Sequence, residues 1–144
     1  MKKLFTCMLA FLTLAISCVF VSCFQKQPLV IKQSDTYIVI TVSDKQMSLA
    51  EDTTLVDYMQ SLKTSGELDF EIKDGMVTSI NHIENPADFS SCWMLYTSDA
   101  DNANTAWGEI EYNGNVYGSS VDGAERLTVK NGCLYIWVYQ SFSV

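Results

Sequence analysis

The chain has 144 residues, a length that fits a single domain. Its 9 basic and 17 acidic side chains give a formal net charge of −8. This balance argues against nucleic acid and against an anionic membrane face as the binding partner, because both need clustered Lys and Arg. Hydrophobic residues make up 48 % of the chain and aromatic residues 12 %, so it does not have the composition of a disordered protein.

The N-terminal segment has the composition of an export signal. Two lysines follow Met1, and residues 4–22 are apolar apart from Thr, Ser and Cys. The stretch Phe20-Val21-Ser22-Cys23 resembles the end of a bacterial lipoprotein signal, in which a small residue precedes the Cys that receives the lipid. We therefore expect a signal peptide over 1–22 and a lipid on Cys23, whose two acyl chains are enough for stable attachment.

This interpretation places the domain on the extracellular face of the bacterial cell membrane, held there by its N-terminal lipid. Three alternatives stay open. The stretch Ala15-Ile16-Ser17-Cys18 is a rival match that would put the lipid on Cys18. The apolar stretch is also close to the length that spans a bilayer, so an uncleaved anchor helix is the second alternative. A simple secretion signal without lipid is the third.

The segment 23–34 is polar with one proline, and it predicts a lipidated tether. The folded domain is then expected over 35–144. Its first strand is indicated by the β-branched run at 37–42.

One helix is expected in the domain. Thr54 fits a helix N-cap, and Asp57 stands three residues later as in a capping box. From Leu55 to about Lys63 the apolar residues recur on one stripe, and Gly66 ends the helix.

Short strands follow the helix. Residues 68–72 alternate between apolar and polar, and a second strand at 76–80 follows the turn at 73–75. The most apolar strand is Cys92–Tyr96, which we expect at the centre of the sheet. The sequence Asn113-Gly114-Asn115 predicts a hairpin turn.

The closing strand is expected at 134–139, an apolar and aromatic run. About seven short strands and one helix predict an α+β fold in which the helix covers a sheet.

The two cysteines of the domain, Cys92 and Cys133, allow two interpretations. In an exported domain they can form a disulfide, and each opens a predicted strand, so a bridge across two strands is geometrically feasible. The alternative is a pair of buried free thiols, because Cys packs as a small hydrophobe. Two cysteines with one histidine cannot close a zinc site, so no metal is expected.

The sequence contains few residues in an arrangement typical of a catalytic site. Nucleophilic catalysis needs a nucleophile, a base and an orienting group, and His82 is the only histidine in the chain. No Gly-x-Ser-x-Gly elbow is present. Nothing else in the sequence indicates an acid–base pair, so we expect a protein that is not an enzyme.

An ordered set of short motifs runs through the domain. They are Thr54–Met59, Phe70–Ile72, Asp74–Asn81, Ile83–Asn85, Trp93–Tyr96, Tyr117-Gly118, Val129–Gly132 and Tyr135–Trp137. Over roughly residues 36–142 this order resembles the transcobalamin-like C-terminal domain family. The resemblance implies a β-grasp-like fold, in which a mixed sheet packs on one helix, and a corrinoid as the candidate ligand. His82 stands where that family usually has Gly, a residue that suits a turn with positive φ.

The candidate contacts for such a ligand come from one loop, one strand and one hairpin. His82 is either a turn residue or an imidazole that contacts the ligand. The aromatic residues are either ligand contacts or part of the core. The candidate set is Asn81, His82, Asn85, Trp93, Tyr96, Trp107 and Tyr117.

Two functions of different classes follow from the sequence. The first is a non-catalytic module that binds a small ligand, with a corrinoid as the candidate, and it predicts a concave aromatic pocket beside the loop at Asn81. The second is a module for adhesion or for interaction with a surface partner protein. It predicts a flat exposed patch or an open strand edge.

Overall fold

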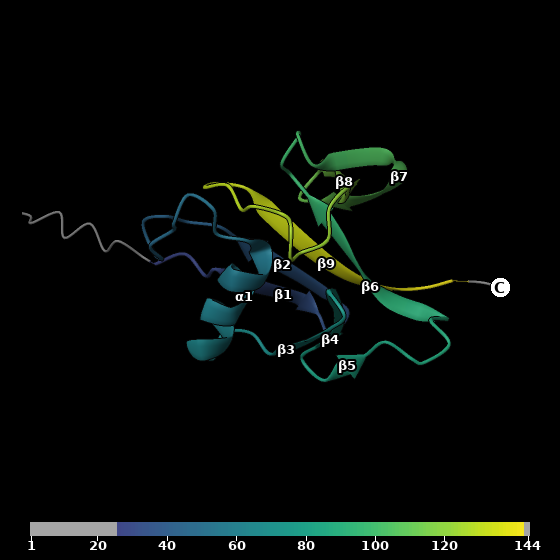
Figure 1. Ribbon diagram of the computed structural model, residues 1–144. Helices are drawn as coiled ribbons and strands as arrows, with labels where there is room; N and C mark the ends of the chain where they lie inside the picture. The colour runs from purple at the N-terminus through teal and green to yellow at the C-terminus, as the bar shows by residue number, and fades with distance from the viewer. Residues whose placement is uncertain (1–25, 143–144) are drawn as a thin grey trace, which may run out of the picture.

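The structure is a computed structural model that describes residues 26–142. Six strands form one sheet in the order β1-β2-β9-β6-β8-β7, and β3, β4 and β5 form a small second sheet. Figure 1 shows helix α1 against one face of the larger sheet, near β1 and β2, with β7 and β8 at the other end. The elements are β1 (Val30–Ser34), β2 (Tyr37–Thr41), α1 (Leu55–Thr64), β3 (Phe70–Lys73), β4 (Met76–Ile80), β5 (Ile83–Glu84), β6 (Ser91–Thr97), β7 (Ala103–Tyr112), β8 (Asn115–Ser120) and β9 (Leu134–Ser141).

The α+β class expected from the sequence is confirmed, since residues 26–142 hold two sheets and a single helix. Every strand pair in this part of the chain is antiparallel, so the mixed sheet implied by the resemblance is not found. The reason lies in the last strand. β9 enters the middle of the sheet and runs opposite to both of its neighbours, β2 and β6.

The expected start of the domain at residue 35 was too late. Residues 30–34 form β1, which pairs with β2, and Leu29 is buried in the core. The expected tether therefore contributes a strand. The short apolar run Leu29-Val30-Ile31 marks this strand, but the polar residues on both sides of it dominate the composition of the segment. The predicted signal peptide at 1–22 and the lipid on Cys23 lie outside the described residues.

The helix and its cap are confirmed. Thr54 Oγ1 accepts a hydrogen bond from the Asp57 N–H at 3.2 Å, and the Asp57 carboxylate accepts one from the Thr54 N–H at 3.2 Å. The first two helical N–H groups donate to the segment before β9, from Leu55 to the Leu127 carbonyl and from Val56 to the Ala124 carbonyl. This holds the N-terminus of α1 against the segment 121–130.

The two faces of the larger sheet bury different residues. We call the face that carries α1 the inner face and the opposite one the outer face. The inner core joins the apolar side of α1 to alternate residues of the strands, among them Ile38, Trp93, Leu95, Tyr135 and Trp137. The outer face carries a smaller core around Val39, Tyr96 and Ile136.

The β7–β8 hairpin covers the outer face. Its turn has the left-handed backbone that the Asn113-Gly114 pair favours, as the sequence predicts. Although three strands separate β2 from β7, Tyr37 of β2 donates a hydrogen bond to the Glu111 carbonyl at 3.2 Å and stacks on Tyr112 at 6.2 Å. The hairpin therefore curls back over the sheet.

A disulfide between Cys92 and Cys133 is not formed, and both are free thiols. The register of β6 and β9 gives the reason. Cys92 is opposite Gln140, whereas Cys133 comes seven residues earlier, just before β9 begins. At about 3.3 Å per residue this separates the two by roughly 23 Å, whereas the Cα atoms of a disulfide lie within about 7 Å.

A buried carboxylate ties the β6–β7 loop to the segment before β9. Asp99 is 3 % exposed and accepts hydrogen bonds from Lys130 Nζ at 2.7 Å and from Asn102 Nδ2 at 2.7 Å. Burial raises the pKa of Asp99, but these hydrogen bonds outweigh it and hold the pKa below its usual value. Lys130 Nζ also lies 2.7 Å from the carboxylate of Asp101, which is exposed.

Asp99→Asn should lower the free energy of unfolding by about 2 kcal/mol at pH 7, because the buried side chain loses the charge that strengthens its hydrogen bonds from Lys130 and Asn102. Asp101→Asn is the matched control, and it should cost much less because the lost partner is solvated. The measurement is urea unfolding of residues 24–144, which contain both cores and every strand pair.

The pH dependence of the same pair has a defined sign. The folded pKa of Asp99 is lowered, so its stabilisation is present above the unfolded pKa of about 4 and is lost as pH falls through the folded value. The difference between the wild type and Asp99→Asn should therefore shrink below about pH 4. Equal losses for Asp99→Asn and Asp101→Asn would contradict this account.

Candidate functional site

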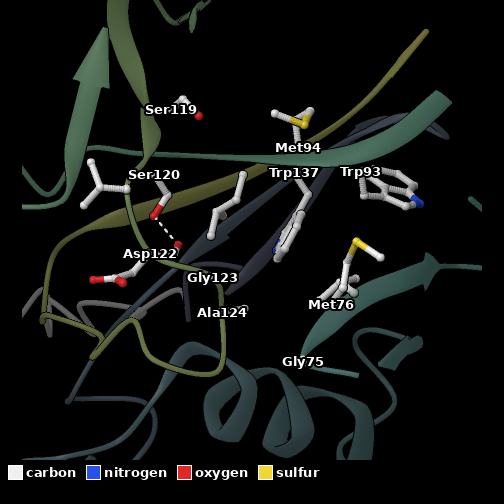
Figure 2. Close-up of a pocket in the computed structure, with 13 residues that line it drawn as sticks. Gly75, Met76, Trp93, Met94, Ser119, Ser120, Asp122, Gly123, Ala124 and Trp137 are labelled. Carbon is white, nitrogen blue, oxygen red and sulfur yellow. Dashed lines mark hydrogen bonds between the residues drawn. The ribbon is translucent and has the colours of Figure 1, made fainter. Parts of the chain in front are cut away.

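The candidate site is a cavity of about 220 Å³ on the inner face, between β6, β9, the start of β4 and the segment after β8. Figure 2 shows its walls. Trp93 and Leu95 of β6 and Trp137 of β9 supply the sheet side. Residues 75–77 and the segment 119–124 supply the other sides.

The two tryptophans of the cavity differ in their hydrogen bonds. Trp93 Nε1 donates to the Ile83 carbonyl at 2.8 Å, and its ring meets Tyr139 edge-on at 5.4 Å. Trp137 is 4 % exposed, and within residues 26–142 its Nε1 has no acceptor. Leaving such a donor unpaired in the interior costs about 1–3 kcal/mol. In Figure 2 the nitrogen of Trp137 lies on the edge of the ring that faces away from Trp93.

Several polar groups of the wall are already engaged. Ser120 Oγ donates to the Asp122 carbonyl at 2.8 Å, the dashed line of Figure 2. The Gly123 carbonyl accepts from the backbone of Arg126, and the Ala124 carbonyl accepts from Val56 of the helix. Trp137 Nε1 is itself enclosed by protein atoms, so a ligand atom cannot reach it without a rearrangement of the wall.

The mouth of the cavity is apolar. Met76 is 42 % exposed, and its side chain lies near both tryptophans in Figure 2. Val121 is an exposed apolar side chain of the cavity wall. Aromatic rings and a thioether attract apolar and flat groups, so the arrangement favours a small flat ligand.

Of the seven candidate contacts predicted from the sequence, Trp93 alone lines this cavity. Asn81 and His82 form the β4–β5 turn with φ of 47° and 67°, the conformation that the family's usual Gly suits. The His82 side chain is 87 % exposed and lies 3.5 Å from Asp69. The structure thus uses His82 as a turn residue.

Asn85 has a structural role. Its Oδ1 accepts from the Trp93 N–H at 3.0 Å, and its Nδ2 donates to the Val77 carbonyl at 3.1 Å. One side chain thereby joins β4 to β6 at the edge of the cavity. It positions Trp93 but does not line the cavity itself.

The remaining three aromatic candidates lie elsewhere. Tyr96 and Tyr117 belong to the outer core, and Trp107 is 64 % exposed on β7. Trp93 and Tyr96 are three residues apart on one strand, and side chains alternate between the faces of a sheet, so they point to opposite sides. The seven residues therefore do not converge on one site.

The predicted set did not include three parts of the cavity wall, namely Trp137, Met76 and the segment 119–124. Trp137 is opposite Leu95, and Trp93 is opposite Tyr139, in the β6–β9 ladder. This register places both tryptophans on the inner face. The sequence marked both strands, but the pairing that brings the two tryptophans together is a tertiary feature.

The arrangement offers binding groups and little acid–base chemistry. Burial raises the pKa of Cys92, which keeps it a thiol and a poor nucleophile. Across residues 26–142 no three His, Cys, Asp or Glu side chains gather where they could hold a metal ion.

Comparison with protein-family models, with curated proteins and with solved structures gave no match to this chain. Over the described part of the chain, no helix has both the length and the apolarity to cross a membrane.

Asn85→Ala should lower the free energy of unfolding by about 2 kcal/mol, because it leaves two part-buried backbone groups without partners. His82→Gly is the contrasting variant in the neighbouring turn. It should be nearly neutral, because Gly adopts positive φ without strain and the His82 side chain is exposed. Urea unfolding of both variants checks the pair. A larger loss for His82→Gly would show that the turn histidine carries the structural role.

Proposed function

We propose that this chain is an exported, lipid-anchored lipoprotein whose domain binds a small ligand without catalysing a reaction. The cavity between Trp93 and Trp137 is the observation that supports the proposal. It joins an apolar mouth and two aromatic rings. A concave site with few polar groups is the usual form of a ligand site.

The proposal keeps the resemblance to the transcobalamin-like C-terminal domain family, with a corrinoid as the candidate ligand and a β-grasp-like packing of one helix on a sheet that is antiparallel here. The single helix against the sheet and the positive-φ turn at Asn81 and His82 support it. A cavity of about 220 Å³ is smaller than the roughly 300–1,000 Å³ of most small-molecule sites. A corrin ring would therefore rest across the mouth, at Met76 and Val121, with one peripheral group inside.

A second candidate function has its own observation. Trp107 and Val116 are exposed on the β7–β8 hairpin, and β7 is an edge strand of the sheet. An open edge with exposed apolar side chains suits a surface partner protein that adds a strand.

Isothermal titration of residues 24–144 with cyanocobalamin and cobinamide tests the first function. We expect saturable binding with a dissociation constant below about 10 µM, or about −7 kcal/mol. Absence of heat with either compound at about 100 µM, some tenfold above that value, would overturn a stand-alone corrinoid site.

Two matched substitutions assign the site. Met76→Lys places a charge at the mouth of the cavity and should weaken binding about tenfold, or about 1.4 kcal/mol. Val116→Lys places the same charge on the exposed hairpin and should leave the ligand affinity unchanged. The reverse pattern would place the ligand on the hairpin and contradict the cavity as the site.

A further inference from the structure

A second cavity lies on the outer face of the larger sheet, between the β1–β2 hairpin and the β7–β8 hairpin. Its volume is about 340 Å³, within the roughly 300–1,000 Å³ of most small-molecule sites. It shares no wall residue with the cavity of Trp93 and Trp137. The wall consists of Gln33, Ser34, Tyr37, Glu111, Tyr112 and Asn113.

The two edge strands of the larger sheet supply most of this wall. Gln33 and Ser34 belong to β1, and Glu111 and Tyr112 belong to β7 at the opposite edge. The curl of the β7–β8 hairpin brings both edges to one cavity, and the hydrogen bond from Tyr37 to the Glu111 carbonyl holds it there. The cavity thus resembles the mouth of a β-barrel, a common position for a ligand site.

Two tyrosine rings form the apolar part of the wall. The rings of Tyr37 and Tyr112 are 6.2 Å apart with an angle of 30° between their planes, so they are close to parallel. Tyr37 is held by strand pairing with Ser34 and Val138 and by the bond from its hydroxyl. Because that hydroxyl is engaged, Tyr37 offers its ring to a ligand. The C–H faces of a sugar ring are apolar and pack on aromatic rings of this kind.

Uncharged polar groups lie beside the rings. Gln33 and Asn113 carry amides, and both residues are exposed. In residues 26–142 the hydrogen bonds given above and below for Glu111 and Asn113 use their backbone carbonyls, which accept from Tyr37 and Asn115. Their side chains remain accessible to a ligand. An amide both donates and accepts, as a sugar hydroxyl does, so the two groups match without charge.

The charge of the wall narrows the ligand class. The wall contains no Lys or Arg, Glu111 is acidic, and the whole chain carries a net charge of −8, so an anionic ligand is disfavoured. An organic cation is best bound over ring faces that enclose it, whereas two nearly parallel rings form a wall. We infer that this cavity binds a neutral saccharide, through ring packing on Tyr37 and Tyr112 and hydrogen bonds to the amides.

Titration of ¹⁵N-labelled residues 24–144 with neutral disaccharides tests the inference. The probes are cellobiose, maltose, lactose and diacetylchitobiose, with glucuronate as an anionic sugar and tetramethylammonium as an organic cation. We expect at least one disaccharide to bind with a dissociation constant of about 1 mM and to shift the side-chain amide signals of Gln33 and Asn113. Glucuronate and tetramethylammonium should bind about tenfold more weakly. The indole signal of Trp93 should stay unchanged, because Trp93 lines the cavity on the other face.

Two substitutions of one tyrosine test the ring packing. Tyr112→Leu removes the ring and should weaken disaccharide binding about tenfold. Tyr112→Phe keeps the ring and should retain most of the affinity. Equal losses for the two variants would contradict packing of the sugar on the ring.

A matched pair of glutamines tests the amide contact and does not disturb either core. Gln33→Ala should weaken disaccharide binding about threefold, because an exposed wall amide is lost. Gln60→Ala makes the same change on the exposed side of α1 and should leave the affinity unchanged. Should Tyr112→Leu fail to fold, this pair still decides the question.

Each other outcome overturns the inference in a defined way. Absence of binding by every disaccharide at about 10 mM, tenfold above the expected constant, would remove the saccharide site. Tighter binding of tetramethylammonium that is lost in Glu111→Gln would make the cavity a cation site. Tighter binding of glucuronate would overturn the neutral class. Disaccharide binding that survives both Gln33→Ala and Tyr112→Leu would place the sugar elsewhere.

The result is independent of the corrinoid titrations, because the two cavities share no residue. The source of the sugar is tested with the tetrasaccharide of the series that binds. A rise in affinity with length would assign the cavity to a polysaccharide, and an equal affinity would assign it to a free sugar.

Discussion

Strand β9 is hydrogen-bonded along both of its edges, to β2 over residues 134–138 and to β6 over residues 135–141. β9 thus joins the β1–β2 hairpin to β6 in the larger sheet. The inward residues of β9 belong to the core that α1 shares, and the outward ones belong to the core that the β7–β8 hairpin covers. Both cores and the candidate site depend on this register, because a slip by one residue would exchange the two faces.

The inner and outer faces of the larger sheet are covered by different elements. On the inner face, α1 and the second sheet supply enough apolar surface to bury Ile38, Leu95 and Tyr135. On the outer face no helix of residues 26–142 is available, so the curled β7–β8 hairpin covers the sheet instead. Gly118 of β8 allows the close approach of β7 where their pairing is irregular, because a Cβ there would lie 2.8 Å from the backbone nitrogen of Asn104.

The cavity lies where the cover over the inner face of the larger sheet is incomplete. α1 covers the sheet near β1 and β2, and the segment 121–130 reaches across to hold the start of the helix. Trp93 and Trp137 lie beyond the part of the sheet that the helix covers, and they line the cavity. Asn85 then fixes Trp93, while Trp137 keeps an N–H without a protein acceptor. A fold optimised for stability alone would have filled this space or paired the donor.

Local signals in the sequence correctly identified the capped helix, the turns at Asp74-Gly75 and Asn113-Gly114, and the strands at 76–80 and 92–96, because each depends on residues a few positions apart. The same signals could not place Trp137 beside Trp93, separate Cys92 from Cys133, or recruit residues 30–34 into the sheet. These features depend on which strands pair and in which register, and the paired residues of β6 and β9 are 38 to 50 positions apart in the sequence. The alternation of apolar and polar residues within one strand predicts that its two faces differ. The strand pairing of the folded sheet decides which elements each face contacts.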